Sequence, residues 1–166
     1  MKLNASRTAQ WPLMAQFVFT HGGWVIDSVD QVKKTFGSTV ANSTDPLEPG
    51  LTAGTGVVFD CIPMPVGAVI TGGEVIIEQA FVGIGAGATL SLGIAGAATA
   101  LVNAMDLDAA AAGARTALAL TAPLLCANGQ NVRLTTAGLA ATATAGKVRV
   151  RVQYTVDGRS NEVQVN

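Results

Sequence analysis

Few side chains in this sequence could perform acid–base, nucleophilic or metal chemistry. His21 is the only histidine, and the two cysteines, Cys61 and Cys126, lie far apart without a C-x-x-C motif, which excludes structural zinc. A serine hydrolase needs a histidine base and a G-x-S-x-G turn, but Thr89 stands where the turn around Ser91 needs its first glycine. The sequence therefore predicts no catalytic residue, no metal ligand and no cofactor, and we expect that the protein is not an enzyme.

Two segments imitate functional motifs without the structural context that those motifs need. The run from Gly83 to Ala88 fits G-x-G-x-x-A, and Asp106 follows about 20 residues later, as in dinucleotide-binding proteins. However, Thr89–Ile94 alternates like a strand instead of opening a phosphate-binding helix, so we interpret the run as a hairpin loop. Glu74 and Glu78 would lie about 13 Å apart on one strand face, whereas glycosidase carboxylates lie roughly 5 to 9.5 Å apart. We expect these glutamates to be solvated or to form inter-subunit salt bridges.

Five side chains are candidates for contact with another protein. Trp11 and Trp24 lie outside any strongly alternating segment, and large aromatic side chains either anchor an interface or fill a core. Arg133, Arg149 and Arg151 could form a basic stripe on one sheet face. Such a stripe would be either a solvated surface or a docking surface for an acidic partner. The sequence leaves both alternatives open for each group.

Composition argues against two classes of partner. Ten Lys and Arg stand against eleven Asp and Glu, which gives a net charge of −1, so nucleic acid is a poor partner. The weakly charged stretch Gln79–Met105 is broken by glycines and lacks the roughly 18 consecutive apolar residues of a membrane span. The first residues also lack the apolar core of a signal peptide. We therefore expect no membrane partner, and a protein that stays in the cytosol of its producer with both cysteines free and buried.

Alternation of apolar and polar residues is clearest in Lys147–Val156, where valines and Tyr154 share one face and basic residues occupy the other. Asp157-Gly158 is a strong turn signal, and Glu162–Val165 can return as the second strand of a hairpin. Shorter runs of strand length recur upstream. They are Gln16–Thr20, Val57–Ile62, Val69–Thr71, Glu74–Glu78, Thr89–Ile94 and Asn131–Thr135.

Two segments have helical rather than alternating spacing. Asp27–Phe36 places apolar residues at helical intervals, and Asp106–Ala114 offers Asp108 as an N-cap before four alanines and Gly113 as a stop. We expect short helices or turns at both places. Ala41–Gly56 is rich in turn residues and predicts a surface loop.

The strand signals together predict an all-β protein of one structural domain. Seventeen Thr and nineteen Val against four Lys and four Glu favour strands over solvent-exposed helices. We expect a jelly-roll or Greek-key β-sandwich with short helical insertions and an N-terminal extension. In this interpretation residues 57–166 form the sandwich, and residues 1–56 form an arm and loop region that packs on it or extends from it.

Several segments together resemble a known class of viral protein. These segments are Pro63–Val75, Ala80-Phe81, Ala88–Gly93 and Ala145–Tyr154, followed by Asp157-Gly158-Arg159. They look like small virion proteins of tailed bacteriophages, which include capsid cement or decoration proteins with a jelly-roll sandwich. The resemblance extends over about Val57 to Gln164, and it brings no catalytic residues with it.

The resemblance implies a structural role in the virion. It suggests a cement or decoration protein that binds the outer surface of a phage head and stabilises it by bridging capsomers. Its partners would be the major capsid protein and further copies of itself, as a dimer or trimer. It would be located on the capsid surface of virions assembled in the cytoplasm of the host bacterium. The alternative is a carbohydrate- or receptor-binding module of a head fibre or tail.

Overall fold

The structure is a computed structural model that describes residues 12–28, 31, 33–35 and 57–156. All regular elements within these ranges are β-strands, which confirms the all-β prediction. Trp11, the expected loop Ala41–Gly56 and the hairpin expected after Asp157 lie outside the described residues.

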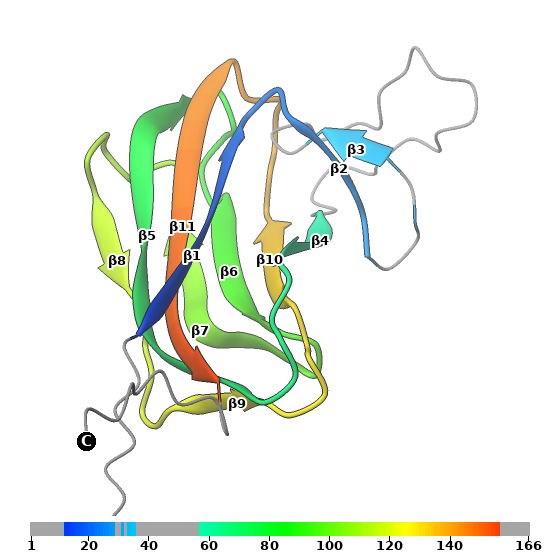
Figure 1. Cartoon of the computed structure of the whole chain (residues 1–166). Helices are drawn as coiled ribbons and strands as arrows, with labels where there is room; N and C mark the ends of the chain where they lie inside the picture. The colour runs from blue at the N-terminus through cyan, green and yellow to red at the C-terminus, as the bar shows by residue number, and fades with distance from the viewer. Residues whose placement is uncertain (1–11, 29–30, 32, 36–56, 157–166) are drawn as a thin grey trace, which may run out of the picture.

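Two antiparallel sheets pack face to face (Figure 1). The first, here called the β5–β11 sheet, has the order β1 (Leu13–Thr20), β11 (Ala145–Val156), β5 (Ala68–Val82), β8 (Arg115–Ala117), and β9 (Leu124–Cys126) also pairs with β5. The second, the β6–β10 sheet, has the order β4 (Val58–Ile62), β10 (Val132–Ala137), β6 (Thr89–Ile94), β7 (Ala97–Asp106). A separate hairpin pairs β2 (Trp24–Ile26) with β3 (Lys33–Thr35).

The strand order identifies the sandwich as a jelly roll. With the β2–β3 hairpin and β9 set aside, eight strands remain, and each sheet contains four of them. One sheet holds the first, eighth, third and sixth of these strands, and the other holds the second, seventh, fourth and fifth. This arrangement is the double Greek key that defines the jelly roll. Its first strand, β1, lies within the residues expected to form the N-terminal arm, and it is an integral part of the β5–β11 sheet.

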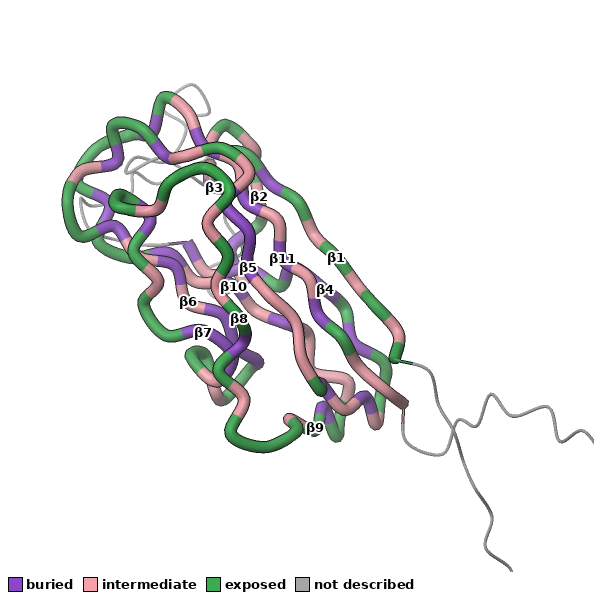
Figure 2. The backbone as a smooth tube through the Cα atoms, turned by 90° about the vertical axis from the view of Figure 1, so that its left-hand side faces the viewer, coloured by how far each residue is buried: buried purple, intermediate pink, exposed green. Residues whose placement is uncertain are grey.

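The core lies between the sheets and follows the predicted alternation. Val148, Val150 and Val152 of β11 are fully buried, and they face leucines such as Leu90 and Leu92 of β6, which are also fully buried. Figure 2 shows this alternation as buried segments interrupted by more exposed ones along the strands. The strands expected at Thr89–Ile94 and at Lys147–Val156 are therefore confirmed.

Three phenylalanine rings pack together where β1 meets β4. The ring centroids of Phe17 and Phe19 lie 5.8 Å apart, and each lies 5.9 Å from the centroid of Phe59. Such tilted and edge-on contacts are favourable for aromatic pairs. The cluster joins the first strand of one sheet to the first strand of the other.

The described parts of Asp27–Phe36 and Asp106–Ala114 contain no helix, so the expected short helical insertions are not seen there, whereas the alternative of a turn is confirmed in Asp106–Ala114. In the first, Lys33–Thr35 forms β3 and pairs with β2. In the second, the side chain of Asp106 accepts the backbone N–H groups of Asp108 and Ala109 at 2.9 and 3.0 Å. This turn competes with helix formation.

Hydrogen bonds to β5 explain why the alanine run is not helical. The backbone N–H of Gly113 donates to the carbonyl of Ile77 at 2.7 Å, and the N–H of Ile77 donates to the carbonyl of Ala114 at 2.9 Å. The end of the run, at Gly113 and Ala114, is thus hydrogen-bonded to a neighbouring strand. The run leads directly into β8.

The glycine-rich run from Gly83 to Ala88 is a crossing connection and not the hairpin loop that its sequence suggested. It joins β5 to β6, which belong to different sheets. Ile84 is fully buried within it, and its carbonyl accepts the backbone N–H groups of Ala140 and Ala141. The run therefore closes one end of the core and does not open a nucleotide-binding helix.

Gly73 allows β5 and β11 to pair closely, and this predicts a large effect of one methyl group. Gly73 has a φ of +143°, and a Cβ there would overlap the carbonyl oxygen of Arg151 and lie 2.9 Å from Leu118. Gly73→Ala should lower the free energy of unfolding in urea by about 3 kcal/mol or more, because overlap adds to backbone strain. Gly72→Ala is the matched control, since its Cβ would meet only the flexible Gln153 side chain at 3.3 Å. Equal losses in the two variants would contradict this account.

Cys61 predicts a decline of stability in alkaline solution. Burial raises the pKa of its thiol from 9.0 to about 12, and the thiol donates to the carbonyl of Val132 at 3.3 Å. Between pH 9 and 12 the unfolded chain therefore loses this proton while the folded chain keeps it. The free energy of unfolding should fall by up to about 1.4 kcal/mol per pH unit from this group. Urea titrations across this range should show a shallower decline for Cys61→Ala, and identical slopes would refute the prediction.

Candidate interaction surfaces

The outer face of the β5–β11 sheet carries a network of ion pairs. Glu74 of β5 binds Arg115 of β8 through both carboxylate oxygens at 2.9 Å, and its Oε1 lies 3.5 Å from Nη1 of Arg151. Glu78, four residues further along β5, binds Lys147 at 2.8 Å and also pairs with Arg149. The two glutamates therefore form salt bridges within this chain, as partners of the basic residues on β11 and β8.

The network neutralises only part of the positive charge on this face. Two carboxylates serve four cations, so the ion-paired set has an excess of two positive charges in a chain whose net charge is −1. The hydrogen bond from Lys147 lowers the pKa of Glu78, and the charges of Arg149 and Lys147 act in the same direction against the opposing effect of desolvation. The Nε atoms of Arg149 and Arg151 are buried without a hydrogen-bond partner among the described residues.

A shallow hollow of about 350 Å³ lies beside Glu74 on this face. Its lining includes Arg115, Arg151, Gln153 and the exposed side chain of Met14 on the edge strand β1. The mixture of charged, amide and thioether groups suits contact with a protein surface. It does not bring together a base and a nucleophile.

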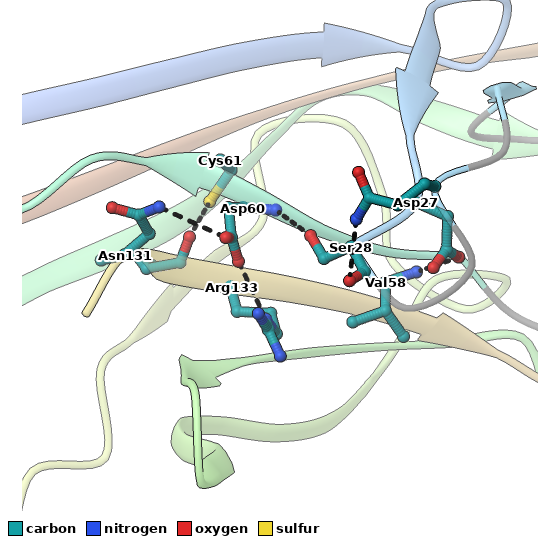
Figure 3. Close-up of polar contacts among 9 residues, drawn as sticks. Asp27, Ser28, Val58, Asp60, Cys61, Asn131 and Arg133 are labelled. Carbon is teal, nitrogen blue, oxygen red and sulfur yellow. Dashed lines mark hydrogen bonds and ion pairs between the residues drawn. The ribbon is translucent and has the colours of Figure 1, made fainter.

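Arg133 does not share a face with Arg149 and Arg151, so the three-arginine stripe does not form. Arg133 belongs to β10 of the other sheet, where its Nε donates to Oδ1 of Asp60 at 2.8 Å (Figure 3). Asn131 donates to Oδ2 of the same aspartate at 3.2 Å. Alternation places a residue on a face of its own strand, but it does not say which sheet that strand joins. A contact role for these arginines remains a prediction.

The β2–β3 hairpin is attached to the edge of β4 by polar contacts (Figure 3). Asp27 Oδ2 accepts the backbone N–H of Val58 at 3.0 Å and forms a buried salt bridge of 2.9 Å with Lys34 of β3. The next residue, Ser28, donates its N–H to the carbonyl of Val58 at 2.6 Å and accepts the N–H of Asp60 on its hydroxyl at 3.0 Å. These contacts both fix the hairpin and cover the outer edge of β4.

The hairpin presents two apolar side chains to solvent. Trp24 is 62% exposed and Ile26 is 46% exposed, with Nζ of Lys33 5.2 Å from the centroid of the indole ring. Trp24 thus lies on the surface and does not fill the core. Its contact with another protein stays a prediction, as does that of Trp11.

A second apolar surface lies at the other end of the sandwich, near β9 (Figure 1). Val66 is 70% exposed and Leu125 is 51% exposed, and Gly67 beside Val66 donates its N–H to the carbonyl of Cys126. Sequence reasoning missed this surface. The available signal was an isolated valine between Pro65 and Gly67, which places an apolar side chain on a turn.

Residues with catalytic or metal-binding chemistry are scattered in the part of the chain that the structure describes. No group of three or more His, Cys, Asp or Glu side chains there could hold a metal ion. His21 lies in the turn after β1, where its backbone N–H donates to the carbonyl of Gly146. No helix among the described residues is long and apolar enough to cross a membrane.

Comparison with known proteins gives one informative similarity. No protein-family model matches the chain, and no curated protein matches it significantly. Among solved structures, a chain of the "Cyanophage Pam1 capsid asymmetric unit" has a similar fold, with a TM-score of 0.58 and 19% sequence identity. The match covers 94% of this chain and 94% of that chain. The two proteins therefore share a fold over nearly their whole lengths.

The Asp27–Lys34 ion pair predicts different effects for two adjacent lysines. Lys34→Met should lower the free energy of unfolding by about 3 to 5 kcal/mol, because it leaves a buried carboxylate without this cation. Lys33→Met should change it by less than about 1 kcal/mol, since Lys33 is half-exposed and its ammonium lies over the face of Trp24. Urea denaturation would measure both values. Similar losses for the two variants would argue against the buried pair as a main stabilising contact of the hairpin.

Proposed function

We propose that this protein is a structural component of a tailed-phage virion. In this proposal it is a cement or decoration protein that binds the outer surface of the head and bridges capsomers. The observation that carries the proposal is the fold match to a capsid chain over 94% of both chains. The match concerns the fold, and the surfaces described above supply the argument for a binding role.

The two apolar surfaces support a bridging role because they lie on different parts of the molecule. Trp24 and Ile26 lie on the hairpin, whereas Val66 and Leu125 lie at the β9 end of the sandwich (Figure 1). A protein that bridges two capsomers needs separate contact surfaces of this kind. Isolated exposed apolar side chains are common, but a tryptophan that is mostly exposed is a frequent anchor of interfaces.

Binding of this kind would stabilise the shell by mass action. A protein that binds the mature lattice better than its precursor shifts the equilibrium towards the mature form. Many weak contacts repeated over a symmetric shell give high overall avidity. The partners in this proposal are the major capsid protein and further copies of this chain, and the location is the capsid surface.

A carbohydrate- or receptor-binding module is the second candidate, because jelly rolls also occur in lectins and Trp24 is exposed. Sugar sites usually combine an aromatic platform with polar side chains in one depression. Here the lining of the hollow beside Glu74 does not include Trp24. Specific binding on a glycan array that Trp24→Ala abolishes would favour this candidate over the capsid role.

The proposal predicts that the protein is an abundant part of purified particles. Quantitative mass spectrometry of virions should find it in many copies, in a constant ratio to the major capsid protein. A cryo-electron-microscopy map should place it on the outside of the shell between capsomers. Absence from purified particles would rule the proposal out.

Single substitutions should then weaken its binding to heads from which it has been stripped. Trp24→Ser and Val66→Ser should each weaken rebinding about tenfold or more, as expected for an apolar anchor in a buried contact. Val82→Ser is the matched control, because Val82 is also exposed but lies outside both surfaces. If all three variants rebind as well as the unaltered protein, neither apolar surface is the contact.

A further inference from the structure

The edges of the two sheets are protected, with one exception. The outer edge of β4 is covered by Asp27 and Ser28. The pairing of β7 with β6 is interrupted by register shifts, and the carbonyl of Leu101 on β7 accepts the backbone N–H of Ala119. The strands β8 and β9 are three residues long each. Short strands, bulges and covering segments are the usual means by which proteins block unwanted strand pairing.

The strand β1 is neither short nor bulged, and no segment among the described residues covers its outer edge. It extends over eight residues, LMAQFVFT, without a charged residue or a proline. Its register with β11 is continuous from Leu13 to Thr20. It runs along the outer margin of the molecule (Figure 2). Such an edge is an open template for another strand.

The hydrogen-bond pattern between β1 and β11 shows which backbone groups of β1 point to its outer edge. The N–H of His21 donates to the carbonyl of Gly146, which continues the β1–β11 register by one pair. Hydrogen-bonded pairs alternate along an antiparallel ladder, so the odd-numbered residues of β1 bond to β11. Met14, Gln16 and Val18 therefore direct their N–H and C=O groups away from β11. No described residue hydrogen-bonds to these groups.

The side chains of the same three residues lie on the outer face of the sheet. Met14 is 59% exposed and Val18 is 38% exposed, and Gln16 between them is also exposed. The set is uncharged and has a polar centre with an apolar residue on each side. It is thus symmetric about Gln16.

We propose that β1 pairs with β1 of a second copy of this chain, antiparallel and about a two-fold axis at Gln16. Facing residues of an antiparallel pair lie on the same face, so Met14 would pack against the partner subunit's Val18, and Val18 against the partner subunit's Met14. Gln16 would lie opposite its own copy, where two amide groups can hydrogen-bond. Each of these pairs would also exchange two backbone hydrogen bonds.

Both ends of the open edge fit this pairing. Pro12, next to β1, has no N–H to donate, and the carbonyl of Thr20 already accepts the N–H of Gly23 at 3.0 Å. The new ladder would therefore extend over residues 14 to 18 and stop. Because a two-fold pairing uses the open edge of both copies, association ends at the dimer. The product is a continuous eight-stranded layer made of two four-stranded paths.

This inference deepens the homo-oligomer part of the proposed function but does not depend on the capsid. It concerns the isolated protein in solution. A monomeric protein found on phage heads would refute the dimer alone, and a β1-paired dimer absent from virions would refute the capsid role alone.

Charge substitutions at Gln16 test the axis directly. In sedimentation-velocity experiments at micromolar concentrations, the unaltered chain should dimerise. Gln16→Lys and Gln16→Glu should each weaken self-association about tenfold or more, because each places two like charges opposite each other at the two-fold axis. An equimolar mixture of the two variants should restore dimers. Gln79→Lys and Gln79→Glu are matched controls, because Gln79 is exposed on β5, which is separated from β1 by the strand β11. Controls that behave like the Gln16 variants would overturn the proposal.

Val18→Pro tests the backbone ladder without disturbing the fold. The N–H of Val18, which this substitution removes, points to the outer edge of β1 and not to β11. The variant should therefore keep an unfolding midpoint close to that of the unaltered chain, but it should no longer dimerise. A dimer that survives Val18→Pro, a trimer, or an unaltered chain that stays monomeric throughout the concentration series would each refute β1 pairing.

Discussion

The structure depends on the antiparallel pairing of β5 with β11. These are the longest strands, with 15 and 12 residues, and they run through the centre of their sheet. Their inner faces supply the buried Val75, Ile77 and β11 valines, and their outer faces bring the glutamates of β5 next to the basic residues of β11. Gly73 permits the close approach that this pairing needs. The core, the ion-pair network and the position of β1 thus all depend on the pairing of β5 with β11.

The sequence predicted the parts of the fold in which local pattern and tertiary environment agree. Lys147–Val156 alternates because one face packs on the core, and Thr89–Ile94 has the same bounds in the structure as in the prediction. The strand β7 was missed because Ala97–Asp106 has no regular alternation, and Leu101 and Val102 are buried one after the other. The alanine run before β8 has a local helical preference, but hydrogen bonds to Ile77 outweigh it.

The interaction surfaces were less predictable, because they depend on register between distant segments. Arg149 and Arg151 could be placed on the polar face of their strand, but their partners Glu78 and Glu74 are known only once β5 and β11 are aligned. Arg133 illustrates the limit, since its face was correctly polar but its sheet was not the expected one. The pairing of Lys34 with Asp27 likewise depends on the pairing of β2 with β3.

The pairing of β1 with β11 has a consequence for how the protein folds. It joins Leu13 to Tyr154, the two ends of the described strand order, so the loop that must close is almost as long as the domain. Contacts of such sequence separation form slowly, because chain entropy is lost before they contribute. β1 can take its place in the sheet only when β11 has been synthesised. Nascent chains therefore lack an ordered β1 edge, and only a completed sandwich can present one.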